Sequence, residues 1–288
     1  MTWTRVATAA VLIPVVVAAV LLGSTGIVAG FAALVAVLAL VEFLALGQPL
    51  GLHGYRLWTC ACAVAVFFQQ WTATQAKSYP FGGGARLLRG PAVAEIPLEL
   101  VLFIFIVGAA ALVFVSREPL ADGLGNLSIS AAGLIFVALP FSAVVRLDAV
   151  AVIGPRLLLM VLVLAWAGDT AAYLVGRALG HLPMAPQLSP KKTWEGSAAN
   201  LLASMAVGLA FAKWLQIEPV EVMAMAAIGN VAGQAGDLLK SVYKRSAGVK
   251  DSGTLLPGHG GMLDRIDSLV LAAPAVWYYF QFIVSPRG

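Results

Sequence analysis

Long apolar segments separated by short polar ones run through the whole chain, and they constrain its fold more than any other feature. The hydrocarbon core of a bilayer takes a helix of about 20 residues. Nine segments have a suitable length and composition, namely 6–22, 27–46, 57–71, 96–115, 129–145, 157–175, 198–215, 220–239 and 269–284. Only 11% of the 288 residues are charged, against about 25% in an average soluble domain. We therefore predict an all-α, polytopic transmembrane helix bundle of about nine spans.

The Lys and Arg residues between these segments indicate an orientation. If the spans alternate in direction, eleven of these residues fall on one side of the membrane and seven on the other. Cytoplasmic loops are usually the richer in Lys and Arg. We therefore expect the N-terminus and the more basic loops to face the cytoplasm.

Polar residues are distributed unevenly between the two halves of the chain. Residues 1–150 read as plain apolar helices, whereas residues 151–288 contain two dense polar loops and two carboxylates, Asp169 and Asp237, inside apolar segments. An ionisable group in a membrane segment is costly and usually marks a functional site, although a hydrogen bond between helices is the alternative for both residues. We expect N-terminal transmembrane helices in residues 1–150 and a C-terminal catalytic transmembrane region in residues 151–288.

The densest polar stretch covers residues 236–267, where cations, carboxylates, one histidine and several glycines are mixed. Mg²⁺ is held by one or two carboxylates plus substrate phosphates, Lys and Arg neutralise phosphate charge, and glycines let the backbone approach a ligand closely. The stretch therefore predicts a metal–polyphosphate site. The candidate residues are Asp237, Lys244, Arg245, Lys250, Asp251, His259, Gly260, Gly261, Asp264, Arg265 and Asp267.

Simpler interpretations of these residues stay open. Asp264 and Asp267, three residues apart on one helix face, could pair with Arg265 and Lys250 as loop salt bridges. The cations could also be anchors whose stems lie along the membrane surface.

A second polar loop, residues 188–196, precedes the segment 198–215. Thr193 or Ser189 could cap the following helix, and Glu195 suits its first turn. Lys191 and Lys192 could meet a phosphate at the helix N-terminus, which also favours an anion. By the span count both polar loops lie on the same side of the membrane, so we predict that they share one site.

Three motifs carry a resemblance to a known family. Residues 241–267 read S-x-x-K-R-x(4)-K-D-x-G-x(2)-L-P-G-H-G-G-x-L-D-R-x-D, which resembles the signature of the CDP-diacylglycerol synthases, also called phosphatidate cytidylyltransferases. Residues 189–196 (SPKKTWEG) and 166–173 (W-x-x-D-T-x-A-Y) are similar to two further blocks of that family. The resemblance covers about the last 130 residues. Leu239 and Lys240 depart from it, because an aromatic–acidic pair is more usual at these positions.

The resemblance implies the reaction CTP plus phosphatidate giving CDP-diacylglycerol plus diphosphate, in phospholipid biosynthesis. It implies a Mg²⁺ requirement, with Asp237 and Asp264 as metal ligands and K⁺ as a candidate second cation. It also implies a polar cavity that faces the cytoplasm from a bacterial inner membrane, and a homodimer as one option. We expect membrane lipids but no nucleic acid among the partners.

The expected roles combine the residue patterns with this resemblance. The catalytic group would comprise Asp237, Lys250, Asp264 and Arg265. The substrate-binding group would comprise Asp169, Ser189, Lys191, Lys192, Thr193, Glu195, Lys244, Arg245, Asp251, His259, Gly260, Gly261 and Asp267.

Two other functions compete with this prediction. A secondary transporter would also contain intramembrane aspartates, but the polar groups gather near one membrane boundary and no inverted repeat is visible. The same cytidylyl transfer onto another lipid phosphate, such as that of an isoprenoid ether lipid, would leave the head-group motifs unchanged.

Overall fold

The computed structural model describes residues 2–76, 96–116, 119–253, 255 and 260–285. The helices are α1 (Thr2–Leu22), α2 (Thr25–Leu46), α3 (Arg56–Ala76), α4 (Leu98–Val115), α5 (Leu120–Gly133), α6 (Leu139–Phe141), α7 (Ala143–Asp148), α8 (Gly154–Leu179), α9 (Trp194–Leu215), α10 (Pro219–Ser246) and α11 (Leu263–Tyr279). Short helical turns follow α2 (η1, Gln48–Leu50), α5 (η2, Leu134–Ala138) and α11 (η3, Phe280–Val284). Strands β1 (Pro183–Ala185) and β2 (Ser189–Thr193) form an antiparallel hairpin between α8 and α9, with Pro183 opposite Thr193.

Within these described ranges, seven helical segments are long and apolar enough to cross a membrane. They are Thr25–Leu50, Leu98–Val115, Leu120–Asp148, Gly154–Leu179, Trp194–Leu215, Pro219–Ser246 and Leu263–Val284. The predicted spans 6–22 and 57–71 are also helical, in α1 and α3. An all-α polytopic membrane protein is thus confirmed, apart from the small hairpin, while the total of nine spans stays a prediction.

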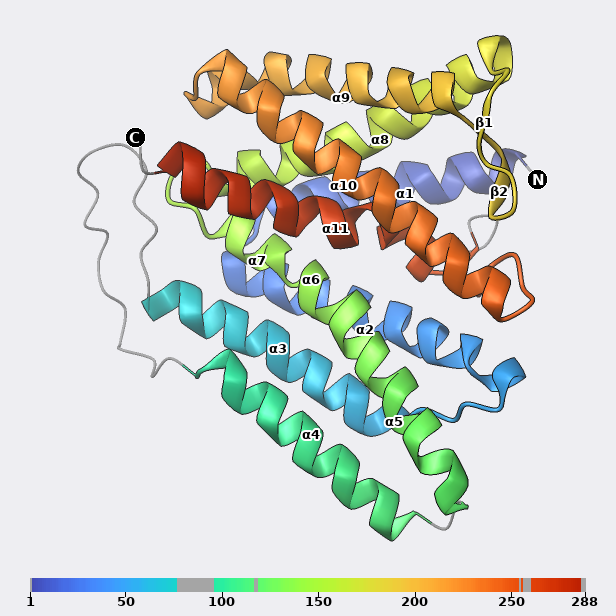
Figure 1. Ribbon diagram of the computed structural model, residues 1–288. Coiled ribbons are helices and arrows are strands. Elements are labelled where there is room, and N and C mark those ends of the chain that lie inside the picture. Colours follow the sequence, from blue (N-terminus) through green and yellow to red (C-terminus); the bar gives the residue numbers. More distant parts are fainter. Residues whose placement is uncertain (1, 77–95, 117–118, 254, 256–259, 286–288) are drawn as a thin grey trace.

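Helices α8, α9, α10 and α11 pack closely because small residues lie where they cross. Gly168 of α8 faces Asn200 and Ser204 of α9, and Gly208 of α9 faces Val222 and Ala226 of α10, so a side chain at either glycine would collide with its neighbours. Figure 1 shows α9, α8 and α10 above α2, α3, α4 and α5, with α11 between the two groups and α1 beside α8.

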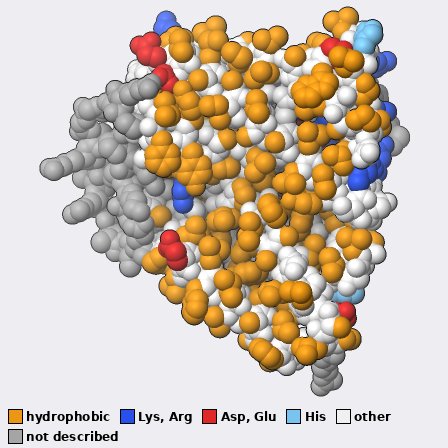
Figure 2. Space-filling model, viewed as in Figure 1, with side chains coloured by type: hydrophobic (Ala, Val, Ile, Leu, Met, Phe, Trp, Pro, Cys, Tyr) orange, Lys and Arg blue, Asp and Glu red, His pale blue; other side chains and the backbone are white. Residues whose placement is uncertain are grey.

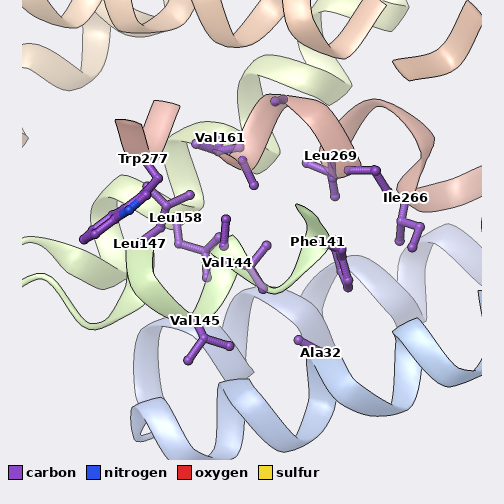
Figure 3. Packing of buried hydrophobic residues seen from close by; sticks show 14 of the residues in the cluster. Ala32, Phe141, Val144, Val145, Leu147, Leu158, Val161, Ile266, Leu269 and Trp277 are labelled. Carbon is purple, nitrogen blue, oxygen red and sulfur yellow. The ribbon is translucent and has the colours of Figure 1, made fainter. Parts of the chain in front are cut away.

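Apolar side chains join the two groups at the centre of the molecule. Figure 3 shows residues of α2, α7, α8 and α11, including Ala32, Val144, Leu158 and Leu269, pointing into one shared core. The outer face is also largely apolar in Figure 2, with a group of Lys and Arg near its right edge. This distribution suits a bundle that is surrounded by lipid and meets water at its ends.

The two polar connections lie at the same end of the bundle. In Figure 1 the β1–β2 hairpin and the connection from α10 to α11 are both at the right, away from the C-terminus. A direct hydrogen bond joins the hairpin to the last turn of α10, from Nε of Arg245 to the carbonyl oxygen of Leu188 at 3.1 Å. The two polar connections therefore lie at one end of the bundle, as the prediction of a shared site requires.

Candidate active site

A polar cavity of about 380 Å³ opens between α8, α9, α10, α11 and the hairpin. Volumes of 300–1,000 Å³ are usual for small-molecule sites. Its charged lining residues are Asp169, Asp237, Asp264, Asp267, Lys191 and Lys192. The cavity thus brings together residues from all three motifs of the sequence.

Three aspartates that line this cavity form a carboxylate cluster with one lysine behind them, namely Asp237, Asp264, Asp267 and Lys240. Nζ of Lys240 lies 3.4 Å from Oδ1 of Asp237 and 3.4 Å from Oδ1 of Asp264, and it also pairs with Asp267. Asp264 and Asp267 are three residues apart on the first turn of α11, so they share a face. On α10, Asp237 and Lys240 have the same spacing. Lys240, whose role the sequence left in doubt, is therefore the common partner of all three carboxylates.

Glycines of α10 allow this close approach. A Cβ on Gly233 would lie 3.3 Å from the carbonyl oxygen of Ser268, and one on Gly236 would lie 2.5 Å from that of Asp267. Side chains at these positions would push α10 away from α11 and separate Asp237 from Asp264.

Two further lysines border the cluster. Lys192 of the hairpin pairs with Asp237, and Nζ of Lys244 on α10 lies 2.9 Å from Oδ1 of Asp264. The Lys192 side chain is 30% exposed, against 9% for Lys240. Lys192 can therefore turn toward a ligand more easily than Lys240 can.

The second oxygen of Asp264 is held by the α10–α11 connection. Oδ2 accepts hydrogen bonds from the N–H of Ser252 at 3.1 Å and of Gly261 at 3.3 Å, and it lies 3.0 Å from Oγ of Ser252. Gly260 has a φ of +77°, a conformation that favours glycine. Of the predicted glycines, Gly260 thus shapes the turn and Gly261 donates to the carboxylate.

Neutral polar side chains of α9 and α10 form a hydrogen-bonded network, of which Ser197, Asn200, Asn230 and Gln234 line the cavity. Ser197 donates to Gln234 at 2.5 Å, Gln234 donates to Asn230 at 2.6 Å, and Asn230 donates to Ser204 at 2.8 Å and to Asn200. Sequence reasoning missed this network. The signal was present, because Asn230 and Gln234 are four residues apart on α10, as are Asn200 and Ser204 on α9, and each pair marks a polar helix face.

The structure gives the other loop residues mainly structural contacts. Thr193 is the N-cap of α9, and its hydroxyl accepts from the N–H of Gly196 at 3.2 Å. Of the two predicted caps, Thr193 and Ser189, the structure thus confirms Thr193. Glu195 accepts from the N–H groups of His181 at 3.1 Å and Leu182 at 3.2 Å. These bonds hold the hairpin onto the start of α9.

Several predicted residues lie outside the polar cavity. Lys250 and Asp251 are exposed and, like Ser189, line neither this cavity nor the one described next. Arg245 joins the last turn of α10 to the hairpin, while Arg265 lines the second cavity. His259 falls outside the described residues. The roles predicted for these residues stay predictions.

A second, mostly apolar cavity of about 340 Å³ lies between α1, α2, α7, α8 and α11. Val16 and Val20 of α1, Phe31 of α2 and Leu158 of α8 are among its lining residues. It shares Asp169, Asp264, Asp267, Ala165 and Ser268 with the polar cavity. The two cavities therefore meet at the aspartates.

The donor chemistry of the cluster also fits a divalent cation. Among the residues that the structure describes, no three His, Cys, Asp or Glu side chains are grouped as ligands of one metal ion. Mg²⁺ does not need such a group, because it usually keeps several waters and takes one or two carboxylates plus substrate phosphates. Asp237 and Asp264 already offer oxygens to one ammonium group, so a single cation can be close to both.

Another residue that sequence reasoning missed is Glu42 of α2. Its carboxylate accepts hydrogen bonds from the N–H groups of Met262 and Leu263, both at 2.9 Å. Glu42 is the only Asp, Glu, Lys or Arg between Arg5 and Arg56. A single charge in an apolar span was itself a signal of function.

A family model and several known proteins match the chain. The model of the cytidylyltransferase family matches residues 3–283. The chain is 33% identical over 241 residues to the phosphatidate cytidylyltransferase of Brucella suis biovar 1, with 81% of this chain and 86% of the relative covered. It is 31% identical over 183 residues to that of Bacillus subtilis, with 63% and 67% covered. It is 45% identical over 123 residues to the phosphatidate cytidylyltransferase of Synechocystis sp., with 42% of this chain and 41% of the relative covered.

Proposed function

Because the chain belongs to the cytidylyltransferase family, we propose that its two cavities bring CTP and phosphatidate together to form CDP-diacylglycerol and diphosphate. The observation that carries this proposal is the junction of a polar and an apolar cavity at Asp169, Asp264 and Asp267. One substrate is a water-soluble anion and the other is a lipid. A site for both needs adjoining surfaces of opposite polarity, with charged groups where the phosphates meet.

We assign the polar cavity to CTP. The triphosphate would lie near Lys192 and Lys244, whose ammonium groups now contact Asp237 and Asp264. The nucleoside would point toward Asn230 and Gln234, because amide groups can both donate to and accept from a base. Asn230 precedes Asp237 by seven residues, a rise of about 10 Å along α10, which leaves room for a nucleoside beyond the phosphates.

We assign the apolar cavity to an acyl chain of phosphatidate. Its walls are aliphatic side chains of α1, α2 and α8, which stabilise a buried hydrocarbon chain in proportion to the apolar area covered. At the shared aspartates the lipid phosphate would emerge beside the triphosphate, near Arg265.

The reaction itself needs little acid–base chemistry. A phosphomonoester has a second pKa near 6 and is largely a dianion at neutral pH, so an oxygen of the lipid phosphate can attack the α-phosphorus of CTP directly. The new P–O bond forms as the bond from the α-phosphorus to the bridging oxygen breaks, and diphosphate leaves with that electron pair. Repulsion between the two anions is the main obstacle, and Lys192, Lys240 and Lys244 reduce it.

We further propose that Asp237 and Asp264 hold Mg²⁺. Bound there, the ion would supply positive charge against the departing diphosphate. Lys240 would keep Asp267 paired and prevent mutual repulsion among the carboxylates. We also propose that this end of the bundle faces the cytoplasm, where CTP is dissolved.

The direct test uses the purified protein in micelles that contain phosphatidate. CTP labelled at the α-phosphate should transfer its label to the lipid, and CTP labelled at the γ-phosphate should release it as diphosphate, only when Mg²⁺ is present. Label transfer without a divalent cation would contradict the metal proposal, and absence of any transfer would contradict the function.

The lipid assignment has a separate test on α1. Val16→Trp would fill the apolar cavity and should raise the KM for phosphatidate with little change in the KM for CTP. Val15→Trp is the matched control, because Val15 is 49% exposed and does not line the cavity. Equal effects of the two substitutions would remove the acyl chain from this cavity.

A further inference from the structure

Glu42 is a buried carboxylate that the proposed reaction does not use. It lies on α2, four residues before the helix ends at Leu46, and it is 9% exposed. A charged group is tolerated in such a place only where hydrogen bonds replace its hydration. The partners of Glu42 therefore indicate its role.

Within the part of the chain that the structure describes, the hydrogen-bond partners of Glu42 come from the α10–α11 connection and the start of α11. Oε1 accepts from the N–H of Met262 at 2.9 Å, Oε2 accepts from the N–H of Leu263 at 2.9 Å, and Oγ of Ser252 lies 3.1 Å from Oε2. The first N–H groups of a helix have no acceptor within it, and negative charge is favourable there. Glu42 thus caps α11 from a position 220 residues away from Met262.

The backbone of the connection lies against this carboxylate at two glycines. A side chain at Gly253 or at Gly261 would collide with the Glu42 carboxylate. Because Gly253 and Gly261 have no side chains, their backbone can lie directly against the Glu42 carboxylate.

The same short segment contacts Asp264 on its other side. Oγ of Ser252 lies 3.0 Å from Oδ2 of Asp264, and the N–H groups of Ser252 and Gly261 donate to that oxygen. Asp264 is the second residue of α11. By capping the start of this helix, Glu42 therefore fixes the position of the Asp264 backbone. Ser252 and Gly261 hold the side chain.

We infer that Glu42 is a positioning residue for Asp264: through the α10–α11 connection it sets the orientation of the carboxylate that would hold the divalent cation. This inference rests on the proposed function only for the identity of the ion. It assigns a part of the active site to α2, in the half of the chain that carries none of the sequence motifs.

The test compares Glu42→Gln and Glu42→Asp in the full-length protein. An amide has one acceptor oxygen and would turn its NH₂ group toward a backbone N–H, whereas Asp keeps both acceptors on a shorter stem. For Glu42→Gln we expect faster hydrogen exchange in residues 260–266. We also expect Mn²⁺ affinity, measured by titration without substrate, to fall about 10- to 100-fold, the usual effect of losing an outer-shell partner. Glu42→Asp should restore part of the Mn²⁺ affinity and part of the protection from exchange. If Glu42→Gln does not fold, the comparison of Glu42→Asp with wild type decides the inference.

Asn126→Ala provides the matched control. Oδ1 of Asn126 on α5 accepts from the N–H of His53 at 2.6 Å, which is also a bond from a helix side chain to a connection. We expect faster exchange near His53 and Mn²⁺ affinity within about twofold of wild type. Wild-type Mn²⁺ affinity in Glu42→Gln, or unchanged exchange in residues 260–266, would overturn the inference. Neither hydrogen exchange nor Mn²⁺ affinity requires turnover. If the wild-type protein catalysed no cytidylyl transfer, the proposed function would be contradicted, but this test could still be carried out.

Discussion

The two connections that close the site differ in what holds them. The α10–α11 connection donates backbone N–H groups to the buried carboxylates Glu42 and Asp264. The β1–β2 hairpin is held by exposed bonds from His181 and Leu182 to Glu195 and from Arg245 to Leu188, together with the partly exposed pair of Lys192 and Asp237. Exposed hydrogen bonds exchange readily with water and add little stability, so segments held by them open more easily. The comparison teaches that one side of the site is fixed and the other can adjust. The fixed side carries Asp264, and the adjustable side carries Lys191 and Lys192.

The largest effect should follow from a change on the fixed side. Asp264→Asn keeps the shape of the side chain but removes its charge, and with it both the proposed metal ligand and the partner of Lys240 and Lys244. We expect the rate of CDP-diacylglycerol formation to fall by at least about 100-fold, as when a preorganised charged group is lost from an active site. The measurement is label transfer from α-labelled CTP.

Asp122→Asn is the control for this prediction. Asp122 is an exposed carboxylate in the first turn of α5 and lines neither cavity. It should keep wild-type activity. Substantial Mg²⁺-dependent activity in Asp264→Asn would show that the fixed side does not hold the essential carboxylate.

The second prediction concerns the cation at the centre of the cluster. Lys240→Met leaves Asp237, Asp264 and Asp267 without their shared ammonium group. Removing one partner from a buried ion pair typically costs about 3–5 kcal/mol. We expect a lower thermal midpoint in detergent, and a larger rise of that midpoint on adding Mg²⁺ than in wild type, because an ion that binds the folded state stabilises it.

Lys213→Met separates this effect from loss of a surface charge. Lys213 is exposed on α9, near its end at Leu215, and its removal should leave the midpoint nearly unchanged. If Lys240→Met is as stable as this control, the cluster does not need an internal cation.

What the sequence could predict was local geometry and the alternation of spans. The spacing of Asp264 and Asp267 placed them on one helix face, the residue preference of N-caps pointed to Thr193 or Ser189, and the alternation put both polar connections at one end. Each of these follows from helix periodicity or from counting spans. Residues of all three motifs line one cavity, as the sequence predicted, while their catalytic and binding roles stay predictions.

What it could not predict depends on contacts between distant segments. Which helix lies against the start of α11 is decided by packing over the whole bundle, so Glu42 gave only the signal of an isolated charge. Lys240 was ambiguous for a similar reason, because its three partners come from two helices. Lys250 and Asp251 belong to the motif, but the described fold leaves their side chains exposed outside both cavities.

The third prediction tests the adjustable side. Lys192→Gln removes a cation that pairs with Asp237 and would turn toward a phosphate. A hydrogen bond to a charged group contributes about 1.5–3 kcal/mol, so we expect the KM for CTP to rise about tenfold or more while kcat changes less. Steady-state kinetics with varied CTP at saturating phosphatidate measures the split. A loss confined to kcat would place Lys192 on the fixed side instead.

The smallest effect should come from the helix cap behind Lys192. Thr193→Ala removes the side chain that accepts from the N–H of Gly196 at 3.2 Å, which costs about 1 kcal/mol at a typical N-cap. Thr193→Ser keeps the hydroxyl and serves as the control. If the hairpin is adjustable, loosening the start of α9 should lower the thermal midpoint by a few degrees, since about 1 kcal/mol shifts the midpoint of a protein of this size by about 2–4 °C. Activity should then fall only a few-fold, because Lys192 can still reach the phosphate from a looser hairpin. A loss as large as that of Asp264→Asn would mean that the hairpin must be held as rigidly as the α10–α11 connection, and the distinction between the two sides would fail.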